Sequence, residues 1–497
     1  MGSFIGIDLG TTFSLVATID KTGRPVIVHN SDGINMTPSV VKLTDDGIAE
    51  IGELARGGLE IDPDTIGRFK IDMGTSKNYE IAGGNYTPTD LSSFVLKKLK
   101  LDTEAAIGEL SEAVITIPAN FSNEGRDATL QAAKAAGLNV NYIVNEPTAA
   151  ALYYAFHRGE ELNGTYAVFD LGGGTFDISI IQVSGQDVEV VTSNGVSKLG
   201  GDNFDKVLQE IVQSKYKEKT GEDLEIEDYT INDAEKDKIS LSKRKKVTSR
   251  VLKENISLTR DEFEENIASY IAQIEMLCES TIEEANMTIE DLNEIFLVGG
   301  SVRVPKIKQI IEKMFGNKVY SSTNIDEAVA LGAALYAAYK GDRTNLTPIQ
   351  KSAVEKIKVG EKTSKYFGTI ALLDDPATGG KKISNSIILD KNMEIPCSVE
   401  QSYYTISDDQ TGVDCTVTES SSREKNPKFV KKVWEGSLEL PSGRPKGQEI
   451  KVTFSYDDNQ IMHCSFIDVG SKKKKEIDLT IKSAEEIESG IDKFTVE

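Results

Sequence analysis

Two short segments of the sequence repeat one chemical pattern: an apolar strand, an aspartate, and a turn built from glycine and hydroxyl residues. The copies are Ile5-Gly6-Ile7-Asp8-Leu9-Gly10-Thr11-Thr12 and Ala167-Val168-Phe169-Asp170-Leu171-Gly172-Gly173-Gly174-Thr175. Glycines in a tight turn let backbone N–H groups approach an anion without a Cβ in the way, and threonine hydroxyls add further donors. The two turns therefore predict a phosphate site built from two related lobes.

Each copy also carries an aspartate at the end of its strand, Asp8 in the first and Asp170 in the second. A carboxylate repels phosphate, but it can hold a magnesium ion or the water around that ion, which then bridges phosphate oxygens. A plain turn after a strand explains a single Asp-Leu-Gly copy equally well. A third glycine segment, residues 295–301, runs into a helix predicted to begin at Pro305. Together the three segments favour a nucleotide site with magnesium.

The elements that must position these turns have a layered α/β pattern over residues 1–345, where short apolar strands alternate with amphipathic helices. Apolar residues at helical spacing in 91–99 predict a helix capped by Thr89. Residues 113–117 predict a buried strand that stops at Pro118. Because the strand-turn pattern occurs twice, we expect two related lobes in this domain.

The pattern changes after a polar, lysine-rich stretch that we interpret as a linker at residues 346–362. Residues 450–456 alternate apolar and polar side chains, and a turn at 457–459 leads into a second alternating run, which predicts a hairpin. We expect an all-β sandwich over residues 363–482. Residues 483–497 could begin a helix.

Composition excludes several functions. Acidic side chains number 79 against 56 basic ones, and a net charge of -23 argues against sequence-independent binding to nucleic acid or to an anionic membrane. The four cysteines have no Cys-x-x-Cys spacing, so a reducing compartment is expected. The sequence has no apolar run long enough to span a bilayer and no basic-then-apolar leader, which together predict a cytoplasmic protein.

Six segments carry a family resemblance. They are residues 5–14, 145–151, 169–177, 199–205, 298–306 and 326–330. In this order the sequence resembles the seventy-kilodalton heat-shock chaperone family, the DnaK-like proteins. The resemblance implies a two-lobed actin-like ATPase domain followed by a β-sandwich that binds peptides. It also implies slow ATP hydrolysis, with the nucleotide state controlling the binding of extended, apolar segments of unfolded proteins.

The resemblance assigns roles across the nucleotide site, with ATP or ADP, Mg²⁺ and optionally K⁺ as cofactors. Magnesium is expected at Asp8 and Asp170, through water, and catalysis at Lys70, Glu146, Thr175 and Asp177. Nucleotide contacts are expected from Gly10, Thr11, Thr12, Gly172, Gly173, Gly174, Gly200, Gly201, Asp202, Glu235, Lys238, Ile239, Ser242, Gly299, Gly300, Ser301, Arg303 and Asp326. The alternative for Lys70 is a solvated surface lysine. The alternative for Glu146 is a structural one: a carboxylate at the start of a helix is stabilised by the helix dipole.

Two further groups of residues follow from the same resemblance. Pro118 and Arg126 match the residues that couple the nucleotide site to the second domain. The apolar peptide cleft is expected at Tyr403, Val413 and Cys415, for which ordinary sandwich core is the alternative. An extended peptide would bind there through main-chain hydrogen bonds and one or two apolar side chains.

Three departures from the family pattern bear on partners. The helical lid that follows the sandwich in the family is not represented in the sequence, and residues 354–359 replace the family's acidic and leucine-rich linker. Tyr142 stands where the family uses arginine for J-domain docking. A nucleotide-exchange factor and a J-domain protein remain expected partners, with J-domain docking questioned by these differences.

Two other functions compete with the chaperone hypothesis. One is a nucleotide-sensing adaptor that binds a dedicated protein partner without a full chaperone cycle, which the altered linker and Tyr142 favour. The other is a sugar or glycerol kinase on the same ATPase fold, which the order of the motifs and the β-rich second half disfavour.

Overall fold

The computed structural model describes residues 3–158, 162–185, 187–320, 324–341, 346–354, 361–363, 365–374, 379–391, 393–420, 422–457, 461–478 and 490–497. The chain divides into two compact units. Unit 1 comprises Met1–Val359 together with Glu485–Glu497, and unit 2 comprises Gly360–Ala484. Within the described residues, no helix is long and apolar enough to cross a membrane.

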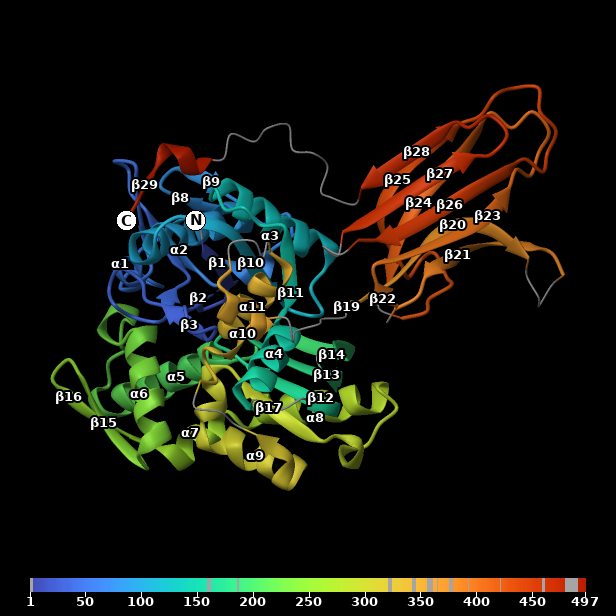
Figure 1. The fold of residues 1–497 in the computed structure, drawn as a ribbon. Coiled ribbons are helices and arrows are strands. Elements are labelled where there is room, and N and C mark those ends of the chain that lie inside the picture. The colour runs from blue at the N-terminus through green and yellow to red at the C-terminus, as the bar shows by residue number, and fades with distance from the viewer. Residues whose placement is uncertain are drawn as a thin grey trace. The chain divides into compact units, whose positions relative to one another are not determined.

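The first lobe of unit 1 is built on a sheet with strand order β11-β10-β1-β2-β3 (Figure 1). Its strands are β1 Ser3–Asp8, β2 Phe13–Ile19, β3 Pro25–Val28, β10 Leu110–Ile117 and β11 Tyr142–Asn145, and the short β4 Thr37–Pro38 also pairs with β2. β1 pairs antiparallel with β2 and parallel with β10, so its apolar side chains are buried between helices on both faces. The covering helices are α2 Pro88–Ile107, α3 Asn123–Ala135, α4 Glu146–Arg158 and α10 Ala328–Lys340.

A smaller sheet in the same lobe has the order β29-β6-β5-β7. Its strands are β5 Val40–Leu43, β6 Ile48–Ile51, β7 Thr65–Gly67 and β29 Thr495–Val496. The short helix α1 Glu53–Arg56 follows β6, the 3₁₀ turn η1 Phe69–Asp72 follows β7, and the hairpin β8 Tyr79–Ile81 and β9 Gly84–Tyr86 leads into α2. The cap of α2 predicted at Thr89 is wrong: Thr87 and Asp90 form a reciprocal capping box one residue before Pro88.

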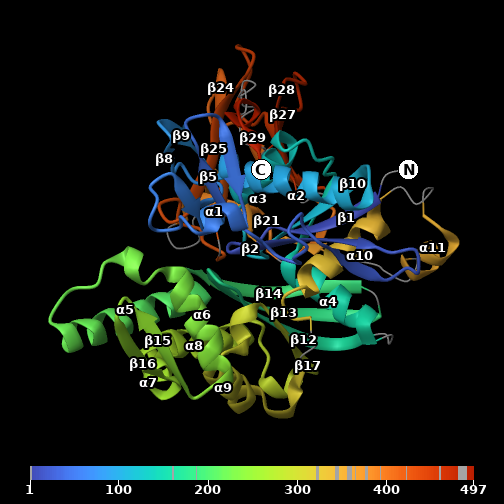
Figure 2. The same cartoon turned by 90° about the vertical axis from the view of Figure 1, so that its left-hand side faces the viewer.

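The second lobe repeats the strand-turn-strand arrangement in a sheet with the order β14-β13-β12-β17-β18. Its strands are β12 Leu162–Leu171, β13 Thr175–Gly185, β14 Asp187–Ser197, β17 Glu294–Val298 and β18 Val319–Tyr320, with a separate hairpin of β15 Lys246–Val251 and β16 Glu254–Thr259. Its helices are α5 Gly201–Thr220, α6 Ile231–Lys243, α7 Arg260–Asn266, α8 Ala268–Glu284 and α9 Pro305–Phe315. Figure 2 shows the two lobes as separate layers, with β12 to β14 on the side of the second lobe that faces the first.

Unit 2 is a β-sandwich of two four-stranded antiparallel sheets, β21-β20-β24-β25 and β23-β26-β27-β28. Its strands are β20 Tyr366–Asp374, β21 Lys381–Leu389, β23 Cys397–Tyr404, β24 Gly412–Ser420, β25 Lys431–Glu439, β26 Glu449–Tyr456, β27 Met462–Asp468 and β28 Lys474–Asp478. A small pair, β19 Glu361–Lys362 and β22 Glu394–Ile395, precedes the second sheet. β26 and β27 form the predicted hairpin, and their alternate residues are buried in the sandwich core.

Two segments outside the predicted domains have a structure that the sequence did not indicate. Part of the predicted linker forms a helix, α11 Pro348–Val354, and Gln350 donates from Nε2 to the carbonyls of Ile19 and Asp20 at 3.2 and 3.0 Å. The predicted helix start at 483–497 is wrong for the part that the structure describes. Residues Gly490–Lys493 form a 3₁₀ turn and Thr495–Val496 form β29, which belongs to unit 1.

Candidate functional site

The two glycine turns meet at a deep pocket of unit 1. A cavity of about 1060 Å³ is lined by residues of both turns. A Cβ on Gly173 would lie 2.0 Å from Thr12 Oγ1, and a Cβ on Gly174 would lie 2.5 Å from Thr11 Cγ2. Such distances are possible only because glycine has no side chain. The turns of the two lobes therefore interleave, as the sequence predicts.

The third glycine segment and the start of α5 complete the wall around the second turn. Gly299 has φ +85, and a Cβ there would meet Leu171 O at 2.4 Å and Asp170 Oδ1 at 2.9 Å. Ser301 Oγ donates to Gly172 O at 2.7 Å, and Gly201 N donates to the same carbonyl at 3.0 Å. Contacts between Gly172 and Gly201, and between Gly173 and Gly200, leave the backbone close-packed around the turn. The pocket wall thus joins three glycine segments that lie far apart in the sequence.

Buried carboxylates surround one lysine at the floor of the pocket. Lys70 Nζ is 2.8 Å from Glu146 Oε1, and Thr116 Oγ1 donates to Asp8 Oδ1 at 3.0 Å. Burial and the charge of Glu146 raise the pKa of Asp8 to about 6 and that of Asp177 to about 7. Burial raises the pKa of Asp170 well above its usual range, and Glu146 and other carboxylates add to the shift.

Lys70 is a buried cation held in this acidic surrounding. Burial lowers its pKa, but the charges of Glu146, Asp8 and Asp177 outweigh that effect, so the pKa is raised overall. The lysine is therefore fully charged at neutral pH. Its side chain is about 8% exposed, so the alternative of a solvated surface lysine does not apply.

A small cavity of about 60 Å³ adjoins the lysine, with Asp177, Thr175 and Pro118 also in its wall. It is large enough for water and has both charged and hydroxyl groups to bind it. Asp177 also accepts a hydrogen bond from Thr175 and one from Asn120. The cavity shares Thr11, Lys70 and Thr175 with the large pocket and can hold a water molecule beside the Asp177 carboxylate.

The carboxylates fit magnesium through water better than by direct ligation. Among the described residues, no group of three or more His, Cys, Asp and Glu side chains is close enough to hold a metal ion directly. Burial and, after it, repulsion from nearby carboxylates raise the pKa values of Asp8, Asp170 and Asp177, while Lys70 lowers them, so a further positive charge here would stabilise their ionised forms. A hydrated Mg²⁺ would supply the missing positive charge.

The predicted adenosine side lies on α6. Glu235, Lys238, Ile239 and Ser242 all line the pocket, together with Gly300. Lys238 is buried and bonded to Asp205 Oδ2 at 2.7 Å and to Gly201 O at 3.0 Å. Lys238 therefore joins α6 to the start of α5. Ile239 is 47% exposed, which leaves an apolar surface free for a flat base.

Three other residues predicted to contact the nucleotide form ion pairs. Arg303 Nη2 lies 2.5 Å from Asp326 Oδ2. Asp202 Oδ2 accepts from Arg68 Nε at 2.5 Å. Arg68 reaches Asp202 from the first lobe, where it has a left-handed backbone with φ +61 and also pairs with Glu60 at 3.0 Å.

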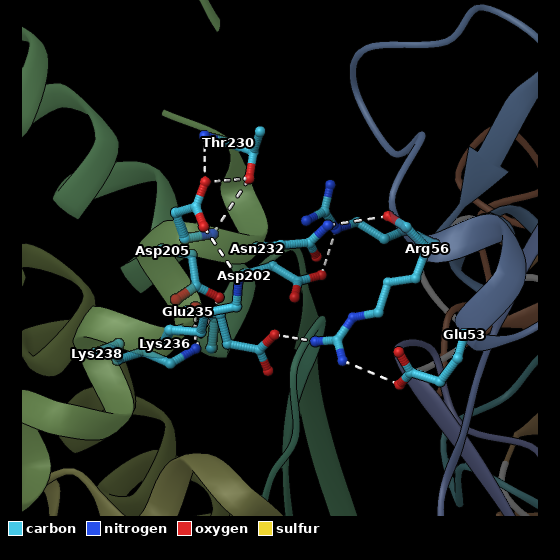
Figure 3. A network of polar contacts seen from close by, with 12 residues as sticks. Glu53, Arg56, Asp202, Asp205, Thr230, Asn232, Glu235, Lys236 and Lys238 are labelled. Atoms are coloured by element: carbon cyan, nitrogen blue, oxygen red, sulfur yellow. Dashed lines mark hydrogen bonds and ion pairs between the residues drawn. The ribbon is translucent and has the colours of Figure 1, made fainter. Parts of the chain in front are cut away.

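A polar bridge across the pocket was missed by the sequence reasoning. Arg56 of α1 forms an ion pair with Glu235 of α6, and it also pairs with Glu53 at 3.3 Å (Figure 3). Asn232 Nδ2 donates to Arg56 O at 2.9 Å, and the Arg56 guanidinium lies 5.0 Å from the centre of the Phe13 ring. Because these partners come from distant parts of the chain, no local spacing in the sequence could have indicated the bridge.

Removing this bridge is expected to speed the release of nucleotide. Both side chains are about a fifth exposed, so the pair contributes at most about 1 kcal/mol. Replacing Arg56 with alanine should therefore raise the off-rate of a fluorescent ADP by up to about fivefold in stopped-flow displacement.

The matched control for this prediction is Lys217→Ala, which removes an exposed ion pair with Asp223 elsewhere on the second lobe. An unchanged off-rate in Arg56→Ala would show that the bridge does not retain nucleotide.

Comparison with known proteins supplies the family. The family model described as Hsp70 protein matches residues 4–497. The chaperone protein DnaK of Thermotoga neapolitana is 34% identical over 503 residues, an alignment that covers 96% of this chain and 80% of DnaK. The chain belongs to the Hsp70 family. The predicted fold class, the ATPase activity and the ATP-dependent chaperone function are confirmed by this membership.

The residues predicted to couple the domains of this Hsp70 protein lie in the first lobe. Pro118 follows the last residue of β10 and lines the small cavity beside Lys70. Arg126 is buried on α3, with 2% exposure. Tyr142, where the resemblance predicts an altered J-domain docking position, begins β11, and Lys340 Nζ lies 5.4 Å from its ring centre.

The three residues predicted for the Hsp70 peptide cleft differ in exposure. Tyr403 and Val413 are half-buried on β23 and β24, and Tyr403 donates its hydroxyl to Ser386 Oγ at 2.9 Å. Cys415 is fully buried in the sandwich core, the environment that the core alternative expects, and the assignment of the three residues to a peptide cleft stays a prediction. Val413 and Cys415 are two residues apart on β24 and therefore lie on the same face of the sheet. Alternation along the strand thus does not explain why Cys415 is more deeply buried than Val413.

Proposed function

We propose that the pocket between the interleaved turns binds ATP and hydrolyses it, and that the nucleotide state sets the affinity of the sandwich for extended peptides. One observation carries the proposal: Gly173 and Gly174 of one lobe pack against Thr12 and Thr11 of the other in the lining of a cavity of about 1060 Å³. Backbone N–H groups from both lobes can therefore bind one polyphosphate together.

The residues around Lys70 have distinct roles in the proposed hydrolysis. Asp177 accepts a proton from the attacking water, because its pKa of about 7 places it near the working pH of a general base. Thr175 orients Asp177 through its hydrogen bond. Lys70 offsets charge that develops on the γ-phosphate, and Glu146 holds Lys70 in place at 2.8 Å.

A hydrated Mg²⁺ is proposed at Asp8 and Asp170. When bound, the ion would supply positive charge beside the phosphate groups of the nucleotide. Asp8 is positioned for this by Thr116, and Asp170 by its place at the end of β12 beside Gly299. Glu146 pairs with Lys70, and Asp177 lines the small cavity, so neither is assigned to the ion.

Unit 2 is proposed as the peptide-binding domain. Unit 2 is the β-sandwich that the family resemblance predicts for peptide binding, and its strands β23 and β24 carry the half-buried Tyr403 and Val413. Tyr404 is the last residue of β23 and Ile406 follows two residues later. Both side chains are about 60% exposed, which leaves apolar surface for an extended segment. Unfolded or extended peptides are the proposed ligands. A nucleotide-exchange factor and a J-domain protein are the proposed protein partners.

The test of this function is the affinity of a labelled extended apolar peptide, measured by fluorescence anisotropy with ATP and then with ADP. A chaperone switch predicts at least tenfold weaker binding with ATP, which corresponds to about 1.4 kcal/mol. Trp434, the single tryptophan, lies in β25 and provides a second readout. Its emission should change when ATP is added if the nucleotide site acts on the sandwich.

Equal affinities and unchanged emission would instead support the nucleotide-sensing adaptor. Hydrolysis stimulated by a small polyol would support the kinase alternative, which the family membership does not favour. The location in a reducing, cytoplasmic compartment stays a prediction. In the structure, Cys278, Cys397, Cys415 and Cys464 are all free thiols.

A further inference from the structure

The last described residues of the chain add a strand to the first lobe of unit 1. β29 pairs parallel with β6, with Thr495 opposite Ile48 and Val496 opposite Ala49. Thr495 N donates to Gly47 O, and Glu497 N donates to Ala49 O, both at 2.9 Å. In return, Ile51 N donates to Glu497 O at 3.0 Å. Figure 1 shows β29 in red among the blue elements of this lobe.

Apolar side chains anchor this segment, which we call the strap (residues 490–497). Ile491 is fully buried in the core cluster of the first lobe. Phe494 packs edge-on against Phe94 of α2, with ring centres 5.6 Å apart, and against Tyr86 at 6.2 Å. The side chains of Lys493 and Thr495 are exposed. The pattern is that of a peptide bound to a sheet edge: main-chain hydrogen bonds with apolar anchors on one side.

The strand that receives the strap leads directly to the nucleotide pocket. β6 ends at Ile51, and α1 with Arg56 begins two residues later. Ile491 shares its core cluster with Phe69, the neighbour of Lys70. The strap therefore packs against the sheet that positions both the bridge arginine and the proposed catalytic lysine.

The chain order gives the strap a mechanical role. Unit 2 lies in the sequence between Val359 and Glu485, so both of its ends continue into unit 1. While the strap is bound, unit 2 is attached to unit 1 at two points. When the strap is released, only the connection before Gly360 remains.

The attachment is small enough to open locally. Hydrogen bonds along one short strand pairing, one fully buried side chain and the partly buried Phe494 and Val496 oppose the ordering entropy of eight residues. Segments with few buried contacts are the ones that open without global unfolding. Because the segment is tethered to its own site, it can also rebind quickly after opening.

We propose that the edge of β6 is a binding site for an extended segment with the strap's apolar anchors, and that the strap is its occupant in the same chain, forming a releasable second attachment of unit 2. This inference does not depend on nucleotide hydrolysis or on peptide binding by the sandwich.

Hydrogen exchange of the full chain, read by mass spectrometry, tests the release. Backbone amides of residues 490–497 should exchange at least tenfold more slowly than in a free peptide of the same sequence, and at least tenfold faster than those of β12 and β13. In Phe494→Ala the strap should exchange at least tenfold faster than in the unmodified chain, while β12 and β13 are unchanged. The matched control is Thr495→Ala, which removes an exposed side chain from the same strand.

Binding of the strap as a separate peptide tests the site. A fluorescein-labelled peptide of residues 490–497 should bind a chain ending at Ala484 at least tenfold more tightly than the intact chain, whose site is already filled. The same peptide carrying Phe494→Ala should not compete. If the shortened chain does not fold, the full chain with Phe494→Ala serves as the acceptor.

Three results would overturn the proposal. If the strap amides of the intact chain exchange as fast as those of the free peptide, the strap is not bound to β6. Exchange as slow as in β12 would show a permanent part of the fold. Equal peptide binding to the intact and shortened chains would place the peptide at another site, such as the sandwich.

Discussion

Replacing Lys70 with alanine is expected to lower the kcat of ATP hydrolysis by about 100-fold or more, while ATP affinity changes by less than tenfold. The reason is geometric. Lys70 is buried among Glu146, Asp8 and Asp177, where a charge acts on the developing phosphate charge without screening by bulk water. Backbone groups of the two glycine turns, which bind the polyphosphate, are untouched by the substitution. Single-turnover phosphate release and equilibrium titration with ATP measure the two effects separately.

The matched control for this prediction is Lys77→Ala. Lys77 is half-exposed and pairs with Asp72 just beyond the same 3₁₀ turn, so it tests the loss of a lysine near this segment without touching the pocket. Unchanged hydrolysis in Lys70→Ala would remove the lysine from the mechanism. A parallel loss in Lys77→Ala would indicate a general disturbance of the segment instead.

Gly173→Ala is expected to weaken ATP binding by about 10- to 100-fold, which corresponds to about 1–3 kcal/mol of steric cost. The new Cβ would meet Thr12 Oγ1 at 2.0 Å and Thr12 Cβ at 2.8 Å. Rotating the threonine side chain leaves the second contact in place, so the two turns themselves must separate. The backbone of Gly173 does not have a positive φ, so alanine is not strained by its own conformation. Isothermal titration with ATP and with ADP measures the loss.

Gly412→Ala is the control for the glycine prediction. Its Cβ would meet no atom closer than Leu438 O at 3.8 Å, and it lies in unit 2. The melting temperature of each variant shows whether the fold is intact. Undiminished ATP affinity in Gly173→Ala would contradict the proposal that both turns grip one nucleotide.

Much of the fold and of the pocket could be predicted because the information is local. Each strand-turn copy specifies its own glycine turn, and the order of the segments identifies the family. Asp8, Asp170 and Thr12 then meet in the pocket because the two related lobes face each other. The hairpin of β26 and β27 was equally predictable from alternation over a few residues.

The errors have a different physical origin. Arg56 and Glu235 are brought together by the approach of the two lobes, and Arg68 meets Asp202 in the same way. A single sequence contains no signal for such pairs. The cap of α2 was placed two residues late because Thr87 and Thr89 both precede the apolar positions, and only Thr87 has Asp90 three residues later. In residues 490–497, the only sequence signal for a strand was the alternation of Phe494 and Val496, which is too short to predict one.

The strap also affects how the protein is made. Synthesis proceeds from the amino terminus, so β5, β6 and β7 leave the ribosome hundreds of residues before the strand that completes their sheet. During that interval β6 has an unpaired edge, the kind of surface that attracts foreign strands. The nascent first lobe of this chaperone is thus itself a candidate for protection by other chaperones until residues 490–497 have been translated.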